Sequence, residues 1–280
     1  MSVAINEDVL KRRIDDYLWR DRSTVVAVLR LLLKEHFLSF DRVAVIGGMV
    51  RDFARAGQRG FKSDVDLVVD APAKSVEELA GRLNAKPNRF GGYSYVTDRW
   101  KIDFWALRAT WAYTEGHASI NRLEDVTNCT FFDWDAVLYD LKRRQVVCSP
   151  TYLDLLRNKA IEINLLPTPS INGNLLRAVR RILLWDLEPG PALGSFIMQH
   201  LTASSFAEIA RTDRAIYTHP FISKFLYAER LQDYIFDRER RTQIATWYGK
   251  QLALPGLPEN ENSMEGSVRR RLVSEDLLVS

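Results

Sequence analysis

Apolar residues near the start of the chain recur in patterns that predict two helices followed by a strand. Residues 6–20 and 22–37 carry apolar side chains at helical spacing. Residues 43–46 are continuously apolar and run into Gly47 and Gly48, as is typical of a buried strand that ends in a turn. Because both helices precede this strand, we expect them to pack beneath the sheet that contains it.

Alternating apolar and polar residues predict further strands. Asp64 and Asp66 are separated by one apolar residue, so their carboxylates are expected on one face of a strand, roughly 6.6 to 6.8 Å apart along the backbone. Residues 91–108 also alternate, and they predict a hairpin that turns near residues 98–99.

A third acid lies in the second strand of this hairpin, residues 100–107. Asp103 stands between two apolar residues, which favours a carboxylate that points away from the core and toward the same face as the acid pair. The alternative is that Asp103 only pairs with Lys101 or Arg99 on the hairpin surface.

Most of the remaining pattern is helical. Residues 75–83 predict a helix in which Ser75 and Glu78 form a capping box. Residues 193–212 and 221–253 predict longer helices rich in aromatic and aliphatic side chains.

Composition narrows the class of protein. The chain has 280 residues, of which 46% are hydrophobic, and no apolar run approaches the roughly 20 residues that span a bilayer. Its start lacks an apolar signal core, so we expect a cytoplasmic protein without a membrane partner. The two cysteines, Cys129 and Cys148, form no CxxC motif and are expected to be reduced thiols. The net charge of +3 is too small to indicate nucleic-acid binding by itself.

The glycine turn and the acid pair together suit the chemistry of a nucleoside triphosphate. Gly47 and Gly48 lack side chains where phosphates would approach, and Gly48 is expected to need a positive φ. A helix that begins after them presents unpaired amide donors. Asp64 and Asp66 offer hard oxygen ligands, which suit Mg²⁺ or Mn²⁺. The alternative is an ordinary glycine-rich turn beside solvated aspartates.

The sequence GGMVRD at residues 47–52, followed by DVD at 64–66, resembles the polymerase-beta-like nucleotidyltransferase superfamily. The resemblance is closest to the head domain of the tRNA nucleotidyltransferases and bacterial poly(A) polymerases. It implies a nucleotidyltransferase of α+β fold, with a small mixed sheet carrying helices on one side and a helical neck-like domain after it. It also implies that Asp64, Asp66 and Asp103 are the catalytic and metal-binding residues.

The resemblance further implies a nucleotide-binding set, which comprises Gly47, Gly48, Arg51, Asp52, Arg108, Arg177 and Arg180. The match is partial in residues 129–140, where Asp133 and Asp135 either hold a base or ribose or only cap a helix, and we favour the structural interpretation. Residues 152–164 and 174–185 resemble the family's strand and first neck helix. The acidic-proline sequence that normally opens this helix is missing, which leaves nucleotide selection open.

Three domains are expected from these patterns. Residues 1–165 form a nucleotidyltransferase head domain with N-terminal helices, and residues 166–253 form a helical neck-like domain. Residues 254–280 form a linker and C-terminal tail, because the segment is rich in Pro, Asn, Glu and Gly.

The expected reaction is template-independent, metal-dependent transfer from a nucleoside triphosphate to a nucleic-acid or protein acceptor. Because only about a hundred residues follow residue 185, we favour an enzyme of bacterial antiviral defence or of a toxin system that makes a short oligonucleotide or modifies a protein or RNA. A shortened tRNA 3′-end enzyme of the CCA-adding kind is the first alternative. An inactive module that binds nucleotide or a partner protein is the second, and a partner protein or a homo-oligomer is compatible with each.

Overall fold

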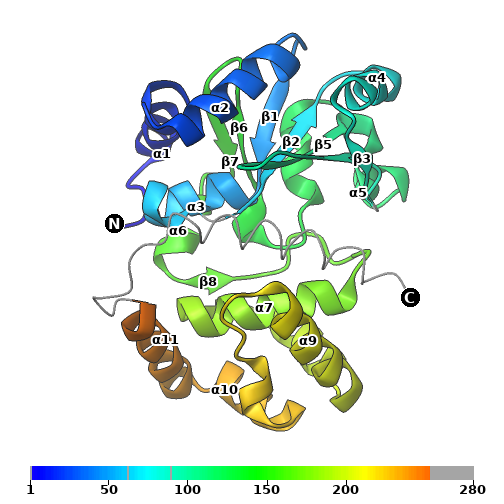
Figure 1. Cartoon of the computed structure of the whole chain (residues 1–280). Coiled ribbons are helices and arrows are strands. Elements are labelled where there is room, and N and C mark those ends of the chain that lie inside the picture. Colours follow the sequence, from blue (N-terminus) through cyan, green and yellow to red (C-terminus); the bar gives the residue numbers. More distant parts are fainter. Residues whose placement is uncertain (1, 62, 89, 253–280) are drawn as a thin grey trace. The chain divides into compact units, whose positions relative to one another are not determined.

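The computed structural model describes residues 2–61, 63–88 and 90–252, and these divide into two compact units (Figure 1). The sheet unit comprises residues up to 158 together with 164–167. The helical unit comprises residues 159–163 and the chain from 168 onward. The expected division into head and neck-like domains at residues 165 and 166 stays a prediction, and the expected linker and tail at 254–280 lie outside the described residues.

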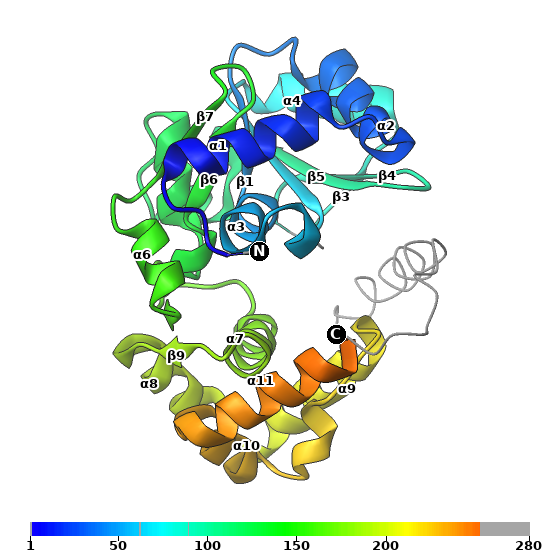
Figure 2. The ribbon, with the colours of Figure 1, turned by 90° about the vertical axis from the view of Figure 1, so that its left-hand side faces the viewer.

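The sheet unit begins with the two helices that the apolar pattern predicts. Helix α1 (Glu7–Asp15) is capped by Asn6 and continues as a π-helical turn to residue 20. Helix α2 (Thr24–Leu32) is capped by Ser23 and continues in the same way to residue 37. Figure 2 shows α1 running across the sheet. Helix α1 contacts strand β7 (Gln145–Cys148) and helix α3 (Gly48–Ala56), which follows the first strand.

Seven strands form one mixed sheet in the order β3-β4-β5-β2-β1-β6-β7. The β2–β5 pair is parallel, whereas the other neighbouring pairs are antiparallel, which confirms the expected mixed sheet. The strands are β1 (Val43–Ile46), β2 (Val65–Val69), β3 (Lys86–Pro87), β4 (Tyr93–Val96), β5 (Lys101–Ala106), β6 (Val137–Asp140) and β7 (Gln145–Cys148).

Helices and 3₁₀ turns connect these strands. They are α3 (Gly48–Ala56), η3 (Gln58–Gly60), α4 (Ala73–Leu83), η4 (Leu107–Ala109), α5 (Trp111–Thr114), η5 (Leu123–Cys129), η6 (Asp133–Asp135) and α6 (Tyr152–Arg157). The predicted capping box at Ser75 is wrong, because α4 begins at Ala73 after Pro72 and the amide of Ser75 already bonds to the Pro72 carbonyl. A strand was expected within residues 152–164. The structure instead has helix α6 over Tyr152–Arg157, and only Ala160–Ile161 form a strand.

Apolar side chains cover both faces of the sheet. Val65 and Leu67 are fully buried, as the alternation of β2 predicts, while Val68 faces the other way. Val68 packs in a second cluster with Leu123 and Val126 of η5. Cover on the second face therefore comes from 3₁₀ turns rather than long helices. Asp66 lies on the same face of β2 as Val68, so the acid pair Asp64 and Asp66 lies next to this second apolar cluster along the strand.

The helical unit is built around α7 (Ile171–Trp185), which contacts each of the four other α-helices. These are α8 (Pro191–His200), α9 (Ala203–Ile216), α10 (Ala228–Phe236) and α11 (Arg238–Leu252), with η7 (Ile222–Phe225) and the short parallel strands β8 (Ala160–Ile161) and β9 (Glu188–Pro189). The two long helices expected here are interrupted. Thr202 ends one because it caps α9, and Leu226, with a φ of 70°, separates η7 from α10.

No helix among the described residues is long and apolar enough to cross a membrane.

Candidate functional site

The strand register brings Asp66 and Asp103 together. Strands β2 and β5 run parallel, and Asp66 pairs directly with Asp103. Asp64 lies just before β2, two residues from Asp66, so its side chain starts on the same face. The neighbouring strand β4 places Ser94 opposite Asp103, and the Ser94 hydroxyl donates a hydrogen bond to Asp103 Oδ1. The structure thus assembles the three predicted acids, whose catalytic roles stay predictions.

Burial, together with mutual repulsion, is the main electrostatic feature of these acids. Burial and the charges of Asp103 and Asp64 raise the pKa of Asp66 to about 8. A carboxyl group with such a pKa is mostly protonated at neutral pH, although a nearby cation offsets part of the repulsion.

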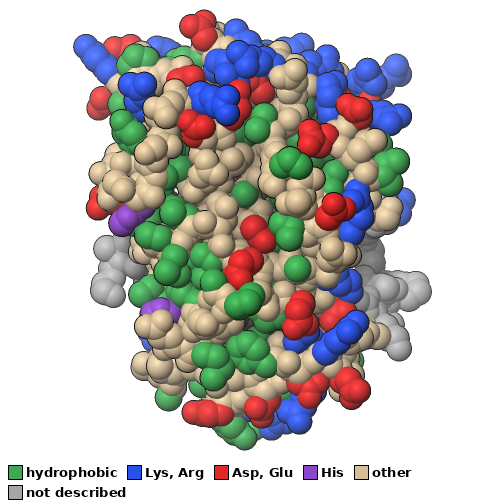
Figure 3. Space-filling view, turned by 180° about the vertical axis from the view of Figure 1, so that it is seen from behind, with side chains coloured by type: hydrophobic (Ala, Val, Ile, Leu, Met, Phe, Trp, Pro, Cys, Tyr) green, Lys and Arg blue, Asp and Glu red, His purple; other side chains and the backbone are tan. Residues whose placement is uncertain are grey.

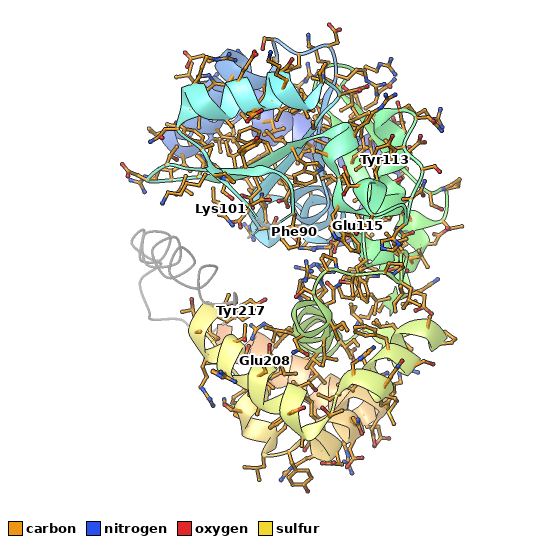
Figure 4. The ribbon with its side chains drawn as sticks, turned by 90° about the vertical axis from the view of Figure 1, so that its right-hand side faces the viewer. Phe90, Lys101, Tyr113, Glu115, Glu208 and Tyr217 are labelled. Atoms are coloured by element: carbon orange, nitrogen blue, oxygen red, sulfur yellow. The ribbon has the colours of Figure 1, made fainter. Side chains whose placement is uncertain are left out.

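Lys101 supplies one such cation. Its ammonium lies 3.4 Å from Asp64 Oδ2 and 3.2 Å from Asp103 Oδ2, and only 8% of its side chain is exposed. In Figure 4, Lys101 lies at the margin of the sheet, where β5 begins. The pairing of Asp103 with Lys101 was the alternative to a catalytic Asp103. The ion pair with Lys101 is present, because residues 101 and 103 of one strand share a face, and the catalytic role of Asp103 stays a prediction.

The glycine turn differs in one respect from the expectation. The positive φ belongs to Gly47, at 66°, whereas Gly48 is the first residue of α3. Gly48 is needed for a different reason, because a Cβ atom there would lie 2.8 Å from the Cβ of Ser63, the residue before Asp64. The turn therefore packs against the residue that precedes the acid pair.

Arg51 and Asp52 are buried in an ion network. Arg51 Nη1 lies 2.6 Å from Asp135 Oδ1, and its Nε and Nη2 donate to Asp52 Oδ1. Burial opposes the charge of Arg51, but the carboxylates of Asp135 and Asp52 raise its pKa above the usual range. Asp135 lies in η6, so the network joins α3 to the segment before β6. This contact favours the structural interpretation of Asp135, and nucleotide binding by Arg51 and Asp52 stays a prediction.

The other predicted arginines lie on elements different from those that carry the acids. Arg108 is exposed and follows the far end of β5, five residues and about 15 Å of chain beyond Asp103. In the helical unit, Arg177 donates to Asn174. Arg180 forms an ion pair with the buried Asp213. Their roles in nucleotide binding stay predictions.

The chemistry of the acids fits a divalent cation, although their present arrangement does not surround one. Asp64, Asp66 and Asp103 are hard oxygen donors of the kind that Mg²⁺ and Mn²⁺ prefer, and their crowding raises the pKa of Asp66. Within the described part of the chain, no three acidic, histidine or cysteine side chains are close enough to hold an ion in this conformation. The ammonium of Lys101 contacts two of the three.

Sequence reasoning missed Ser94, named Lys101 only as a possible partner of Asp103, and named Asp135 without its bond to Arg51. Lys101 precedes Asp103 by two residues, so strand alternation alone could have placed both on one face. Ser94 follows from pairing the two hairpin strands around the predicted turn. No signal in the sequence links Asp135 to Arg51, because 84 residues separate them.

Comparisons with known proteins support the same fold. No protein-family model matches the sequence, and no curated protein matches it. Among solved structures, the Thermotoga maritima CCA-adding enzyme complexed with tRNA is 18% identical, with a TM-score of 0.50 over 97% of this chain and 70% of that one. A CCA-adding enzyme with CTP is 16% identical, with a TM-score of 0.50 over 97% and 71%. A CCA-adding enzyme in apo form is 18% identical, with a TM-score of 0.53 over 82% and 57%.

Similarity to solved structures at identities this low shows the fold alone. The mixed sheet and the helical unit of this chain agree with that fold. The chain therefore has the polymerase-beta-like nucleotidyltransferase fold, with a mixed-sheet head followed by neck-like helices.

Proposed function

We propose that this protein transfers a nucleotidyl group from a nucleoside triphosphate to an acceptor hydroxyl, without a template. The observation that carries the proposal is the pairing of Asp66 with Asp103, with Asp64 two residues away and the Gly48 turn packed against Ser63. The three acids and the glycine turn are thus brought together in one part of a nucleotidyltransferase fold.

The reaction forms one phosphorus–oxygen bond and breaks another. The acceptor oxygen attacks the α-phosphorus, the bond to the bridging oxygen of the β-phosphate breaks, and pyrophosphate leaves. Asp64 and Asp66 would hold Mg²⁺ or Mn²⁺, which supplies neutralising charge for the triphosphate and activates the hydroxyl when bound. Asp103, which accepts a hydrogen bond from Ser94, would accept the proton of the hydroxyl.

Nucleotide binding begins at the turn. Gly47 and the amides at the start of α3 would receive phosphate oxygens, since the helix N-terminus offers unpaired donors and a positive dipole. Arg51 would support this turn through its bonds to Asp52 and Asp135. We retain Arg108, Arg177 and Arg180 as candidates for the triphosphate or the acceptor.

The test is incorporation of labelled NTPs and dNTPs with Mg²⁺ or Mn²⁺. Asp64→Asn and Asp66→Asn should each reduce incorporation at least about a hundredfold, because charge neutralisation in the transition state is lost. Asp98→Asn, which changes an exposed acid in the hairpin turn, is the matched control. Incorporation at the wild-type rate by the folded double variant Asp64→Asn/Asp66→Asn would refute the proposal and favour an inactive binding module.

The acceptor is a separate question. An RNA 3′ end is our first candidate, because a CCA-adding enzyme complexed with tRNA matches the fold over 97% of this chain. Assays with and without tRNA that lacks its terminal nucleotides decide this point. Product that requires this tRNA supports the RNA acceptor. Short oligomers, or a mass increase on a protein, formed without tRNA would instead support the defence or toxin role.

A further inference from the structure

Lys101 is unusual among the residues of the site because it brings positive charge to a place that the proposed chemistry gives to a divalent ion. Its side chain is 8% exposed, and its ammonium lies within 3.4 Å of carboxylate oxygens of Asp64 and Asp103. A buried ammonium is costly unless it is paired, so these contacts are what make the position tolerable.

The backbone fixes this arrangement. Val65 pairs with Ile102 in the parallel register, so Asp64 and Lys101 precede the same pair by one residue each. Lys101 and Asp103 share a strand face, as do Asp64 and Asp66. Three carboxylates and one ammonium therefore start from adjacent positions of two neighbouring strands. A cation that binds Asp64 and Asp103 together would lie beside an ammonium that already contacts one oxygen of each carboxylate.

We propose that Lys101 is a positioning residue that holds Asp64 and Asp103 with its own charge and has to leave this position when a divalent cation binds there. The inference rests on the proposed function, because it takes the acids to be the metal site. Lys101 then has two effects of opposite sign. It stabilises the protein without metal, and it weakens the binding of the metal by competition.

The test measures metal binding rather than activity. Mn²⁺ affinity of the full chain, measured by titration calorimetry or by electron paramagnetic resonance of free Mn²⁺, should rise about tenfold or more in Lys101→Met, because a competing positive charge is removed. Thermal stability in EDTA should fall in the same variant, and Mn²⁺ should raise its melting temperature more than it raises that of the wild type. Lys142→Met, which removes an exposed lysine from the turn between β6 and β7, should change neither quantity.

Two further variants keep the test decisive. Lys101→Gln keeps a polar side chain and should show the same gain in affinity if Lys101→Met does not fold. Asp64→Asn combined with Lys101→Met should lose the gain, which assigns the bound ion to the acids.

The outcomes separate the two proposals. Equal or weaker Mn²⁺ binding by Lys101→Met and Lys101→Gln overturns the competition and leaves Lys101 as a partner of structural importance only. No Mn²⁺ binding by the wild type or by either variant overturns the inference together with the proposed function.

Discussion

Gly48 and Ser63 pack so closely that a Cβ atom on Gly48 would lie 2.8 Å from the Cβ of Ser63. The contact joins the first residue of α3 to the residue before Asp64. It explains why the turn requires glycine at this position even though its backbone φ is not positive.

Gly48→Ala should therefore destabilise the protein by about 1–3 kcal/mol, as overpacking does. Ser63→Gly should recover much of this loss in the double variant, and urea unfolding would measure both effects. Gly81→Ala is the control, because a Cβ at that position in α4 meets no atom within 4 Å. A Gly48→Ala variant as stable as the wild type would contradict the packing.

Asp213 is the second site at which we expect a large effect on stability. It is fully buried, pairs with Arg180, and accepts backbone N–H groups of Phe221 and Ile222. Asp213→Ala should cost about 3–5 kcal/mol in urea unfolding, because the guanidinium loses its partner. The exposed Asp233 pairs only at 3.8 Å with Arg240, so Asp233→Ala should change the stability by less than about 1 kcal/mol. Similar values for the two variants would contradict this role.

The raised pKa of Asp66 predicts a pH dependence of stability in EDTA. The native state keeps a proton that the unfolded chain releases, so the contribution of Asp66 to stability falls as the pH rises from about 4 to about 8. Asp66→Asn removes this effect. Between pH 5 and pH 8, the stability of the variant relative to the wild type should rise by about 1–3 kcal/mol. Asp98→Asn should show no such trend, and parallel profiles for Asp66→Asn and wild type would count against the crowding of the acids.

The two cysteines should react slowly in the native protein. Burial raises the pKa of Cys129 to about 11 and that of Cys148 to about 12, so little thiolate exists at pH 8. Alkylation by iodoacetamide should be at least about tenfold slower than for free cysteine, and intact-protein mass spectrometry would follow it. Denaturation in guanidinium chloride should restore the fast rate. Fast labelling of the native protein would show that the thiols are accessible.

Local patterns in the sequence predicted the sheet unit best. The run at 43–46 and the alternation around Asp64 and Asp103 follow from a strand period of two residues, and the glycine turn marks where β1 ends. The parallel pairing of β2 and β5 could not be read from these segments, because it depends on partners about 37 residues apart. Without that pairing, the contact of Lys101 with Asp64 stayed hidden.

The helical unit was predicted as a class but not in its divisions. Apolar side chains continue at helical spacing through residue 202, yet Thr202 caps a new helix there. Leu226 adopts a left-handed backbone that is rare for a leucine, so no sequence pattern announces this break. The partner of Arg180 was equally inaccessible, since Asp213 lies on another helix.

Charge on the surface gives little further information on the acceptor. Figure 3 shows acidic and basic side chains interspersed among the described residues of one face, with Lys and Arg most abundant along its upper end. A mixed surface of this kind agrees with the small net charge of the chain.

Arg51 and Asp52 are the last two residues of the GGMVRD sequence, and both are bound into the connection between α3 and Asp135. The motif therefore joins a strand, a turn and a helix, whereas the acids of the proposed metal site lie outside it. A related protein that had exchanged Asp64, Asp66 and Asp103 would still use Arg51 and Asp52 for this connection. In a survey of genomes the motif would identify the architecture, and only the acids would distinguish an enzyme from a silent copy.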